Sequence, residues 1–429
     1  MKTNFRILNG KKTILNTLSN HVTYYPTPSN INYNWSFGSL VGIVFALQII
    51  TGIFLAMHYT AHVDLAFASV EHIMTDVKWG YTFRYFHSNG ASMIFILMYL
   101  HVGKGLYYQS YITRPFLWYS GLVIFLLMMA TAFIGYVLPW GQMSFWGATV
   151  ITSLVTAVPV IGEDIAYWIW GGFSINNATL VRFFSIHYLL PFLIVGIILS
   201  HLVLLHTKGS THPLLTSNHG DKITFHPYFS YKDAFILTIT FVFFTWLVFF
   251  YSNLLGHSDN FIAANPLVTP AHIVPEWYFT PFYAILRACP DKIGGAISML
   301  AAILILFLLP TYQNFFSKNK LIVISFSPLH KLFFWLFVAI FFILMFLGSN
   351  PAAAPFIILS KIFTILYFSY FLIFIPILTL FDDFAMDKNL FPVKPKSSKE
   401  SNTFLNCTPR VVGKIRRSPI QHWWLSKFY

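Results

Sequence analysis

Charged side chains are scarce in this sequence. Asp, Glu, Lys and Arg together make up 10% of its 429 residues, whereas 56% are hydrophobic, and the mean hydropathy is +0.65. Soluble domains carry roughly 25% charged residues. The composition therefore excludes a water-soluble enzyme and indicates an integral membrane protein.

Cysteine is almost absent, with Cys289 and Cys407 as its two examples. Two thiols cannot build a disulfide framework, and neither lies in a C-x-x-C-H haem-attachment motif or a zinc-binding pattern. Any haem is therefore held by ligation and packing instead of thioether bonds. The sequence also lacks a ligand set for an iron–sulfur cluster.

Acidic residues are the scarcer charge type: 14 Asp and Glu against 27 Lys and Arg give a formal net charge of +13. The basic residues lie between and after apolar segments instead of gathering in one soluble domain, which argues against nucleic acid as a partner. With the N-terminus inside, 21 of the 27 fall on inner segments, the bias that membrane insertion produces. We therefore predict that both termini lie on the inner side.

Apolar stretches dominate the rest of the chain, and spanning a bilayer takes about 20 such residues. Eight candidates occur, at 38–57, 91–107, 118–138, 183–205, 234–251, 294–310, 332–347 and 356–378. The sixth is short unless flanking residues join it. The sequence predicts an all-α membrane protein with eight transmembrane helices.

Two pairs of histidines lie inside these stretches, His87 with His101 and His187 with His201, and each pair is 14 residues apart. Fourteen residues are close to four helical turns, so both members project from one helix face, roughly 21 Å apart. Ionisable groups at bilayer depth are costly and point to function. The predicted topology brings His87 level with His187 and His101 level with His201. Such His–His gaps fit two six-coordinate haems, which favours electron transfer.

Glycines repeat the same interval: Gly38 and Gly52 are 14 residues apart, as are Gly121 and Gly135. A missing side chain lets a macrocycle edge approach a helix backbone closely, although small residues also serve helix–helix packing. Arg84, three residues before His87, is placed to pair with a haem propionate, or to snorkel towards the membrane interface.

Three segments outside the predicted spans complete the organisation. The outer connections 139–181 and 252–293 are too long for simple turns and are rich in Trp, Pro and Gly, which is typical of functional loops. The tail from Lys388 onward is basic and ends near two tryptophans. It suits docking on a partner or on anionic lipid.

The sequence closely resembles the cytochrome b family, whose members are the central subunits of cytochrome bc complexes (respiratory complex III). The segments that carry the resemblance are RYFHSNGASMIFILMYLHVGKG (84–105), GYVLPWGQMSFWGATVIT (135–152), RFFSIHYLLPFLIVGIILSHLVLLH (182–206) and PEWYF (275–279). It covers about residues 30 to 380. By this resemblance His87 and His187 ligate the low-potential b-type haem, and His101 and His201 the high-potential one, both without covalent attachment.

The resemblance also implies a domain division. Residues 1–30 form an inner N-terminal segment, and 31–222 form a four-helix di-haem bundle with the outer loop 139–181. Residues 223–387 form a four-helix region with the PEWY loop, and 388–429 form the basic tail, for which the family offers no role.

Quinol oxidation near the outer face is implied by the PEWY motif, Pro275 to Tyr278. Quinol releases two protons with its two electrons, and Glu276 is the predicted proton acceptor; alternatively it is an ordinary acid at a helix start. The resemblance places further residues in this pocket: Tyr136, Gly147, Ile151, Pro275, Tyr278 and Tyr283.

Quinone reduction near the inner face consumes protons, and the resemblance assigns to this site His206, Ser210, Lys232 and Asp233. An interfacial histidine and a helix-start aspartate are the alternative interpretations. Three positions depart from the family pattern: Lys104 stands where Arg is common, Thr207 where an acid is common, and Ser36 where an amide is frequent. Lysine preserves charge but not bidentate geometry.

The family implies that one electron from quinol passes to an external Rieske iron–sulfur protein, while the other crosses the membrane through the haems. Partners would then include a cytochrome c1-type subunit, other complex subunits and the lipid bilayer, in a dimeric complex. Residues 1–20 show no signal peptide, although a weakly basic, acid-free start also fits a transit peptide. The predicted location is the mitochondrial inner membrane, or alternatively a bacterial plasma membrane.

Three other functions remain open at this stage. A secondary transporter or channel would use the histidines as proton relays and bind no pigment. A transmembrane haem reductase would lack quinol bifurcation, against which the PEWY motif argues. A structural haem scaffold would have no turnover.

Overall fold

The computed structural model describes residues 19, 21, 23–213, 221–316 and 327–387. The basic tail from Lys388, Cys407 and most of the segment 1–30 lie outside the described residues. Within them the chain is almost entirely helical. Its one sheet there pairs β1 (Pro26–Pro28) with β2 (Lys222–Thr224) in antiparallel register, Thr27 opposite Ile223.

Eight long helical segments correspond to the eight predicted spans. They are α2 (Phe37–Ala56), α4 (Gly80–Tyr107), α6 (Pro115–Val137), α9 (Asn177–Lys208), α10 (Tyr228–Phe250), α12 with α13 (Lys292–Leu304 and Leu309–Phe316), α14 (Pro328–Gly348), and α15 with α16 (Phe356–Ser369 and Ile375–Asp387). In the described residues, seven of them are long and apolar enough to cross a membrane. The eighth is α4, whose 28 residues include polar side chains such as Asn89 and Lys104. The predicted all-α membrane fold is confirmed.

The short sixth stretch is completed by its flanks. A 3-10 turn, η5 (Ile305–Leu308), joins α12 to α13, so the apolar segment runs over Lys292–Tyr312, 21 residues. The last span is also composite, because a π-helical turn, η7 (Tyr370–Phe374), joins α15 to α16. Helical hydrogen bonding continues through these junctions because backbone polar groups cannot be left unpaired in lipid.

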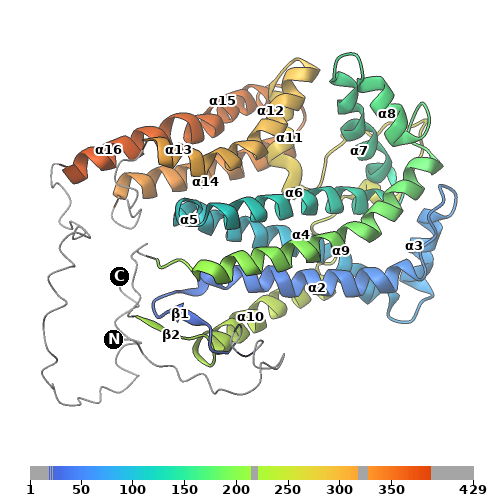
Figure 1. The fold of residues 1–429 in the computed structure, drawn as a ribbon. Helices are drawn as coiled ribbons and strands as arrows, with labels where there is room; N and C mark the ends of the chain where they lie inside the picture. Colours follow the sequence, from blue (N-terminus) through green and yellow to red (C-terminus); the bar gives the residue numbers. More distant parts are fainter. Residues whose placement is uncertain (1–18, 20, 22, 214–220, 317–326, 388–429) are drawn as a thin grey trace, which may run out of the picture.

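The long helices lie side by side in two groups (Figure 1). α2 packs against α4 and α6 against α9, with α10 beside α4, while α12, α14 and α15 surround the short α11 (Thr280–Ala288) in the second group. The beginning of α2 and the end of α16 lie at the same end of the bundle (Figure 1), as an even number of crossings requires.

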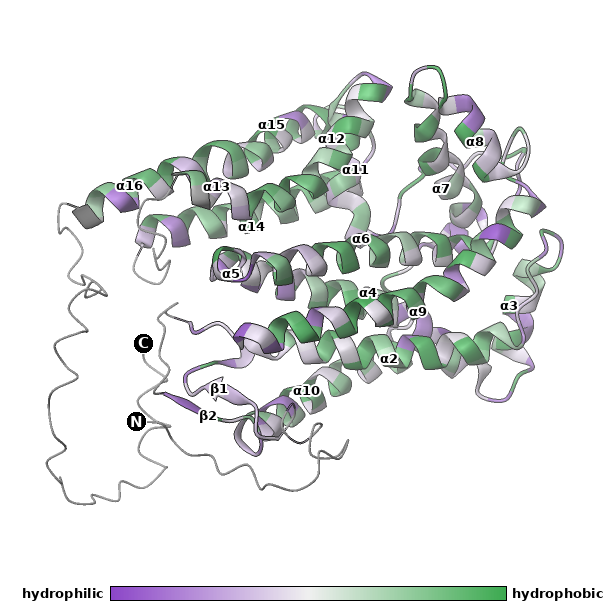
Figure 2. Ribbon diagram, viewed as in Figure 1, coloured by the Kyte–Doolittle hydropathy of each residue, from purple (hydrophilic) through white to green (hydrophobic). Residues whose placement is uncertain are grey.

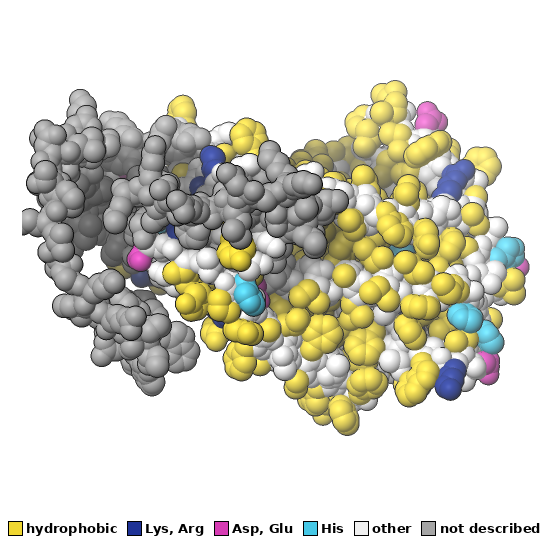
Figure 3. Space-filling model, turned by 60° about the horizontal axis from the view of Figure 1, so that its bottom comes forward, with side chains coloured by type: hydrophobic (Ala, Val, Ile, Leu, Met, Phe, Trp, Pro, Cys, Tyr) yellow, Lys and Arg dark blue, Asp and Glu magenta, His cyan; other side chains and the backbone are white. Residues whose placement is uncertain are grey.

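Hydrophobic residues line the middle of the helices, and hydrophilic ones gather near their ends (Figure 2). The outer surface is also hydrophobic: yellow side chains cover much of the face drawn in Figure 3. Leu189 is 66% exposed and Phe250 74%. Apolar side chains on a helix surface at this density are suited to lipid contact.

The two long connections are folded instead of extended. The first holds α7 (Gln142–Ser153), η2 (Leu154–Ala157) and α8 (Gly162–Trp170); the second holds η3 (Ser258–Phe261) and η4 (Trp277–Phe279). The Gln142 side chain joins them, because its Nε2 donates to the Val268 carbonyl at 3.1 Å and its Oε1 accepts from the Asn265 N–H at 2.9 Å. α3 (Ala66–Thr75) lies at this same end (Figure 1).

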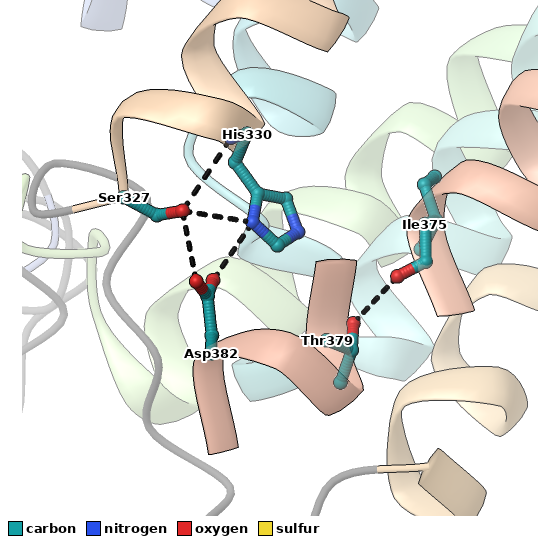
Figure 4. Close-up of polar contacts among 5 residues, drawn as sticks. All are labelled: Ser327, His330, Ile375, Thr379 and Asp382. Carbon is teal, nitrogen blue, oxygen red and sulfur yellow. Dashed lines mark hydrogen bonds and ion pairs between the residues drawn. The ribbon is translucent and has the colours of Figure 1, made fainter. Parts of the chain in front are cut away.

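A buried polar cluster ties α14 to α16 at the opposite end (Figure 4). The Nδ1 of His330 lies 2.8 Å from the Asp382 carboxylate, and the Ser327 hydroxyl donates to the same carboxylate at 3.0 Å. Ser327 is also the N-cap of α14. All three side chains are buried, and buried polar groups are retained where they satisfy one another.

Candidate functional site

The outer pair of predicted histidines meets between α4 and α9. The ring centroids of His87 and His187 are 6.3 Å apart, and their planes are 86° apart. Within the described residues no cluster of three or more His, Cys, Asp or Glu side chains could hold a metal ion. Two facing imidazoles are the ligand set of a six-coordinate haem iron.

Three of the four histidines have their Nδ1 atom hydrogen-bonded to a neighbouring helix: His87 to Thr51 at 3.0 Å, His187 to Thr131 at 2.9 Å and His201 to Ser120 at 2.8 Å. The partner of His187 is a backbone carbonyl, which only accepts, so its Nδ1 carries the proton and its Nε2 keeps a lone pair. A ligating histidine needs this arrangement. In the described part of the chain, the buried Nδ1 of His101 has no such partner.

Each predicted glycine faces one predicted histidine. If a Cβ were added at each glycine, its distance to the nearest atom of the histidine ring would be short in all four cases. The distances are 3.1 Å for Gly38 and His101, 3.0 Å for Gly52 and His87, 3.2 Å for Gly121 and His201, and 2.4 Å for Gly135 and His187. By contrast, nothing lies within 4 Å at Gly42, between the first two. Each of these four glycines therefore leaves room for a histidine ring of a neighbouring helix.

A cavity of about 670 Å³ connects the outer histidines to the PEWY motif. Its lining, mostly apolar, includes Arg84, His87, His187, Gly52, Gly135, Tyr136, Glu276 and Tyr278. Several polar residues that were not predicted from the sequence also line it, among them Gln48, Ser92 and Asn260. Gln48 was detectable as an amide within an apolar run, where it donates to the Phe86 carbonyl at 3.0 Å. Asn260 gave no sequence signal.

Glu276 is the acid of this cavity and directly precedes η4. Burial raises the pKa of its carboxyl from 4.5 to about 7, against the opposing effects of the Tyr136 hydroxyl and the Arg84 guanidinium. A carboxyl that titrates near neutral pH can accept and release a proton under physiological conditions.

Four of the predicted outer residues do not line this cavity: Gly147, Ile151, Pro275 and Tyr283. Gly147 and Ile151 lie on α7. The Tyr283 hydroxyl donates to the Ile273 carbonyl at 3.3 Å, and the Arg287 guanidinium carbon lies 4.4 Å from its ring centroid. The structure therefore does not bring these four residues into the cavity that holds Glu276.

At the inner end, Asp233 is held by serines of another helix. Its carboxylate accepts hydrogen bonds from Ser36 at 2.6 Å and from Ser39 at 3.0 Å. The neighbouring Lys232 donates to the Asn32 carbonyl at 3.0 Å. Ser36, a departure from the family pattern, thus retains a polar contact with the predicted acid.

His206 lies in a separate set of contacts. Its ring stacks on His21 at 5.2 Å and meets Tyr25 at 4.6 Å between centroids, and Ser210 lies near the Tyr25 hydroxyl. Among the described residues no ion pair joins His206 to Asp233. The sequence analysis missed His21 and Tyr25, which are too far from His206 in the chain for spacing to connect them.

Comparisons with known proteins agree with the sequence motifs. The chain matches the family described as cytochrome b/b6/petB over residues 22–209, and cytochrome b(C-terminal)/b6/petD over 263–368. It is 53% identical over 378 residues to cytochrome b of Chondrus crispus, covering 88% of this chain and 98% of that protein. Identity to cytochrome b of Triticum aestivum is 54% over 364 residues, covering 85% and 90%. A chain of a hyperthermophilic respiratory complex III superposes with a TM-score of 0.81 at 31% identity, covering 87% and 98%.

Proposed function

The chain belongs to the cytochrome b family and is a membrane subunit of the complex III type, and from this premise we propose that it binds two b-type haems and conducts electrons from quinol to quinone. A haem between two axial imidazoles supplies one-electron chemistry without an open coordination position. His87 and His187 would hold the outer group, and His101 and His201 the inner one. Arg84, in the wall of the outer cavity, would pair with a propionate.

The outer cavity is the proposed site of quinol oxidation. Quinol loses its electrons only as it loses its hydroxyl protons, so the site needs a base close to the outer electron acceptor. Glu276 shares the cavity with His87 and His187, and its carboxyl titrates near pH 7. Tyr136 and Tyr278, in the same lining, would orient the quinol ring.

Quinone reduction is proposed for the inner end. Reduction consumes protons, and His206 and Asp233, each held by its own set of neighbours, would deliver them. Ser210 and Lys232 would line the same pocket. Protons would then be released outside and taken up inside, and moving one charge across the membrane costs about 2.3 kcal/mol per 100 mV.

The complex around the chain follows from the same premise. We propose an iron–sulfur protein as the acceptor of the first electron, a cytochrome c1-type partner beyond it, and a dimeric assembly in the mitochondrial inner membrane. Residues 31–222 would form the di-haem unit and 223–387 the unit that carries the PEWY loop.

The observation that carries the proposal is the single cavity that joins the outer histidine pair to Glu276. The test is a reduced-minus-oxidised spectrum of purified complex containing His201→Leu. We expect the inner haem band to disappear and quinone reduction to stop, while the outer band remains as an internal control for folding. The neighbouring Ser200→Ala should keep both bands. Two intact bands in the His201 variant would contradict its assignment, and a colourless wild-type preparation would favour a transporter.

A further inference from the structure

The helix that carries His87 and His101 also holds the PEWY segment in place. Three α4 side chains contact it. The Ser92 hydroxyl accepts from Trp277 Nε1 at 3.0 Å, Phe95 stacks on Tyr278 at 4.0 Å between centroids with planes 4° apart, and the Tyr99 hydroxyl donates to the Tyr278 backbone carbonyl. Each contact falls on one of the two residues that follow Glu276.

These side chains form a stripe separate from the histidines. Positions 92, 95 and 99 fall on one face of a helix, since they are three and four residues apart. At about 100° per residue, that face lies roughly a third of a turn from the face of His87 and His101. One side of α4 therefore faces the predicted haem sites, and another side faces the PEWY segment.

The segment needs such support. η4 spans only three residues before α11 begins at Thr280, and short 3-10 turns have poor hydrogen-bond geometry. Ser92, Phe95 and Tyr278 are buried, while Tyr99 and Trp277 are half-buried, so both hydrogen bonds are at least partly shielded from water and the loss of a partner is costly. The sequence alone gave no sign of this link, because α4 and η4 are separated by about 180 residues.

We propose that Ser92, Phe95 and Tyr99 are positioning residues for the proton acceptor Glu276, so that one helix sets the geometry of both the haem ligands and the quinol-oxidation acid. The inference rests on the proposed quinol oxidation at the outer cavity. It also gives a reason why the distance between Glu276 and the proposed outer haem is fixed, because α4 positions both of them.

The test compares Tyr99→Phe and Ser92→Ala in the intact purified complex. Tyr99→Phe keeps the ring that packs against Phe341 at 5.2 Å and removes one hydroxyl. Because an ordinary hydrogen bond contributes about 1 kcal/mol, we expect kcat/KM for quinol to fall about fivefold in each variant. Both haem bands should stay at wild-type intensity. The control is Tyr107→Phe on the same helix, whose ring packs on Phe334; it should behave as wild type.

The pH profile distinguishes positioning from a general loss of structure. If Glu276 loses its place in the cavity, its carboxyl gains water and its pKa falls from about 7 towards its ordinary value. The acidic limb of the pH profile for quinol oxidation should then move to lower pH in Tyr99→Phe and Ser92→Ala. In Glu276→Gln this limb should be absent, because the titrating carboxyl is gone. A wild-type profile and kcat/KM in both variants would overturn the inference. Absence of quinol oxidation in the wild type would instead overturn the proposed function, and the inference with it.

Discussion

Gly135 illustrates how a single missing side chain leaves room for one imidazole ring, that of His187. A Cβ at this position would lie 2.4 Å from the Cε1 atom of His187, whereas ordinary contact begins at 3.4 Å. The ring cannot yield freely, because its Nδ1 is hydrogen-bonded to the Thr131 carbonyl at 2.9 Å. The glycine thus acts on the imidazole that we propose as an outer ligand, not only on helix packing.

We predict that Gly135→Ala displaces His187 and weakens outer haem binding by about 10- to 100-fold, the usual cost of disturbing a ligand's support. Gly196→Ala, at a position with nothing within 4 Å, is the matched control. Haem content and the outer band of the difference spectrum measure the effect. An unchanged outer band in Gly135→Ala would show that the ring has room to move.

At the scale of elements, the C-terminal spans depend on buried polar contacts as well as on apolar packing. The Ser327, His330 and Asp382 cluster joins the start of α14 to α16 (Figure 4). Asp382 is 0% exposed. If its carboxylate were removed, Ser327 and His330 would lose a hydrogen-bond partner that water could not replace. Leaving one member of such a pair unmatched is costly even where the pair itself adds little.

We predict that Asp382→Ala lowers the free energy of unfolding by about 3–5 kcal/mol. Thr379→Val, one turn earlier on α16, is the control, because the Thr379 hydroxyl only bonds to the Ile375 carbonyl of its own helix at 2.8 Å and its loss should cost about 1 kcal/mol. Thermal unfolding of the solubilised complex measures both. Equal midpoints for the two variants would contradict a role for the cluster in joining the helices.

At the scale of the whole molecule, an apolar exterior and polar ends orient the chain in a bilayer (Figures 2 and 3). Helices α7 and α8 lie at one end, and the β1–β2 sheet lies at the other (Figure 1). If the helices span the bilayer, this arrangement puts the sites that we propose for oxidation and reduction near opposite membrane surfaces.

The topology can be tested with two cysteine variants in a chain whose Cys289 and Cys407 are replaced by serine. Asp64→Cys lies in the connection before α3, where the side chain is 82% exposed, and Asp221→Cys precedes β2 at the opposite end. In sealed vesicles of known orientation, an impermeant thiol reagent should label position 64 only from outside and position 221 only from inside. Labelling of both from one side would refute the arrangement.

The sequence by itself determined the fold class and the candidate ligands. An unbroken apolar run that crosses a bilayer forms a helix, because a helix pairs all of its backbone N–H and C=O groups internally. Residues 14 positions apart lie on the same face of such a helix, whatever surrounds it. The four histidines, the four glycines and Glu276 were therefore identifiable from spacing, residue type and family motif.

Tertiary structure alone decided which residues share a site. The pairing of each glycine with a particular imidazole, the cavity common to His87 and Glu276, and the grip of Ser92 and Tyr99 on the PEWY segment all join residues on different helices. The spacing of residues in the sequence describes one helix at a time. It predicts on which face of the helix a side chain lies but not which residues that side chain contacts. The partner is fixed only when the helices pack, through contacts between residues far apart in the chain.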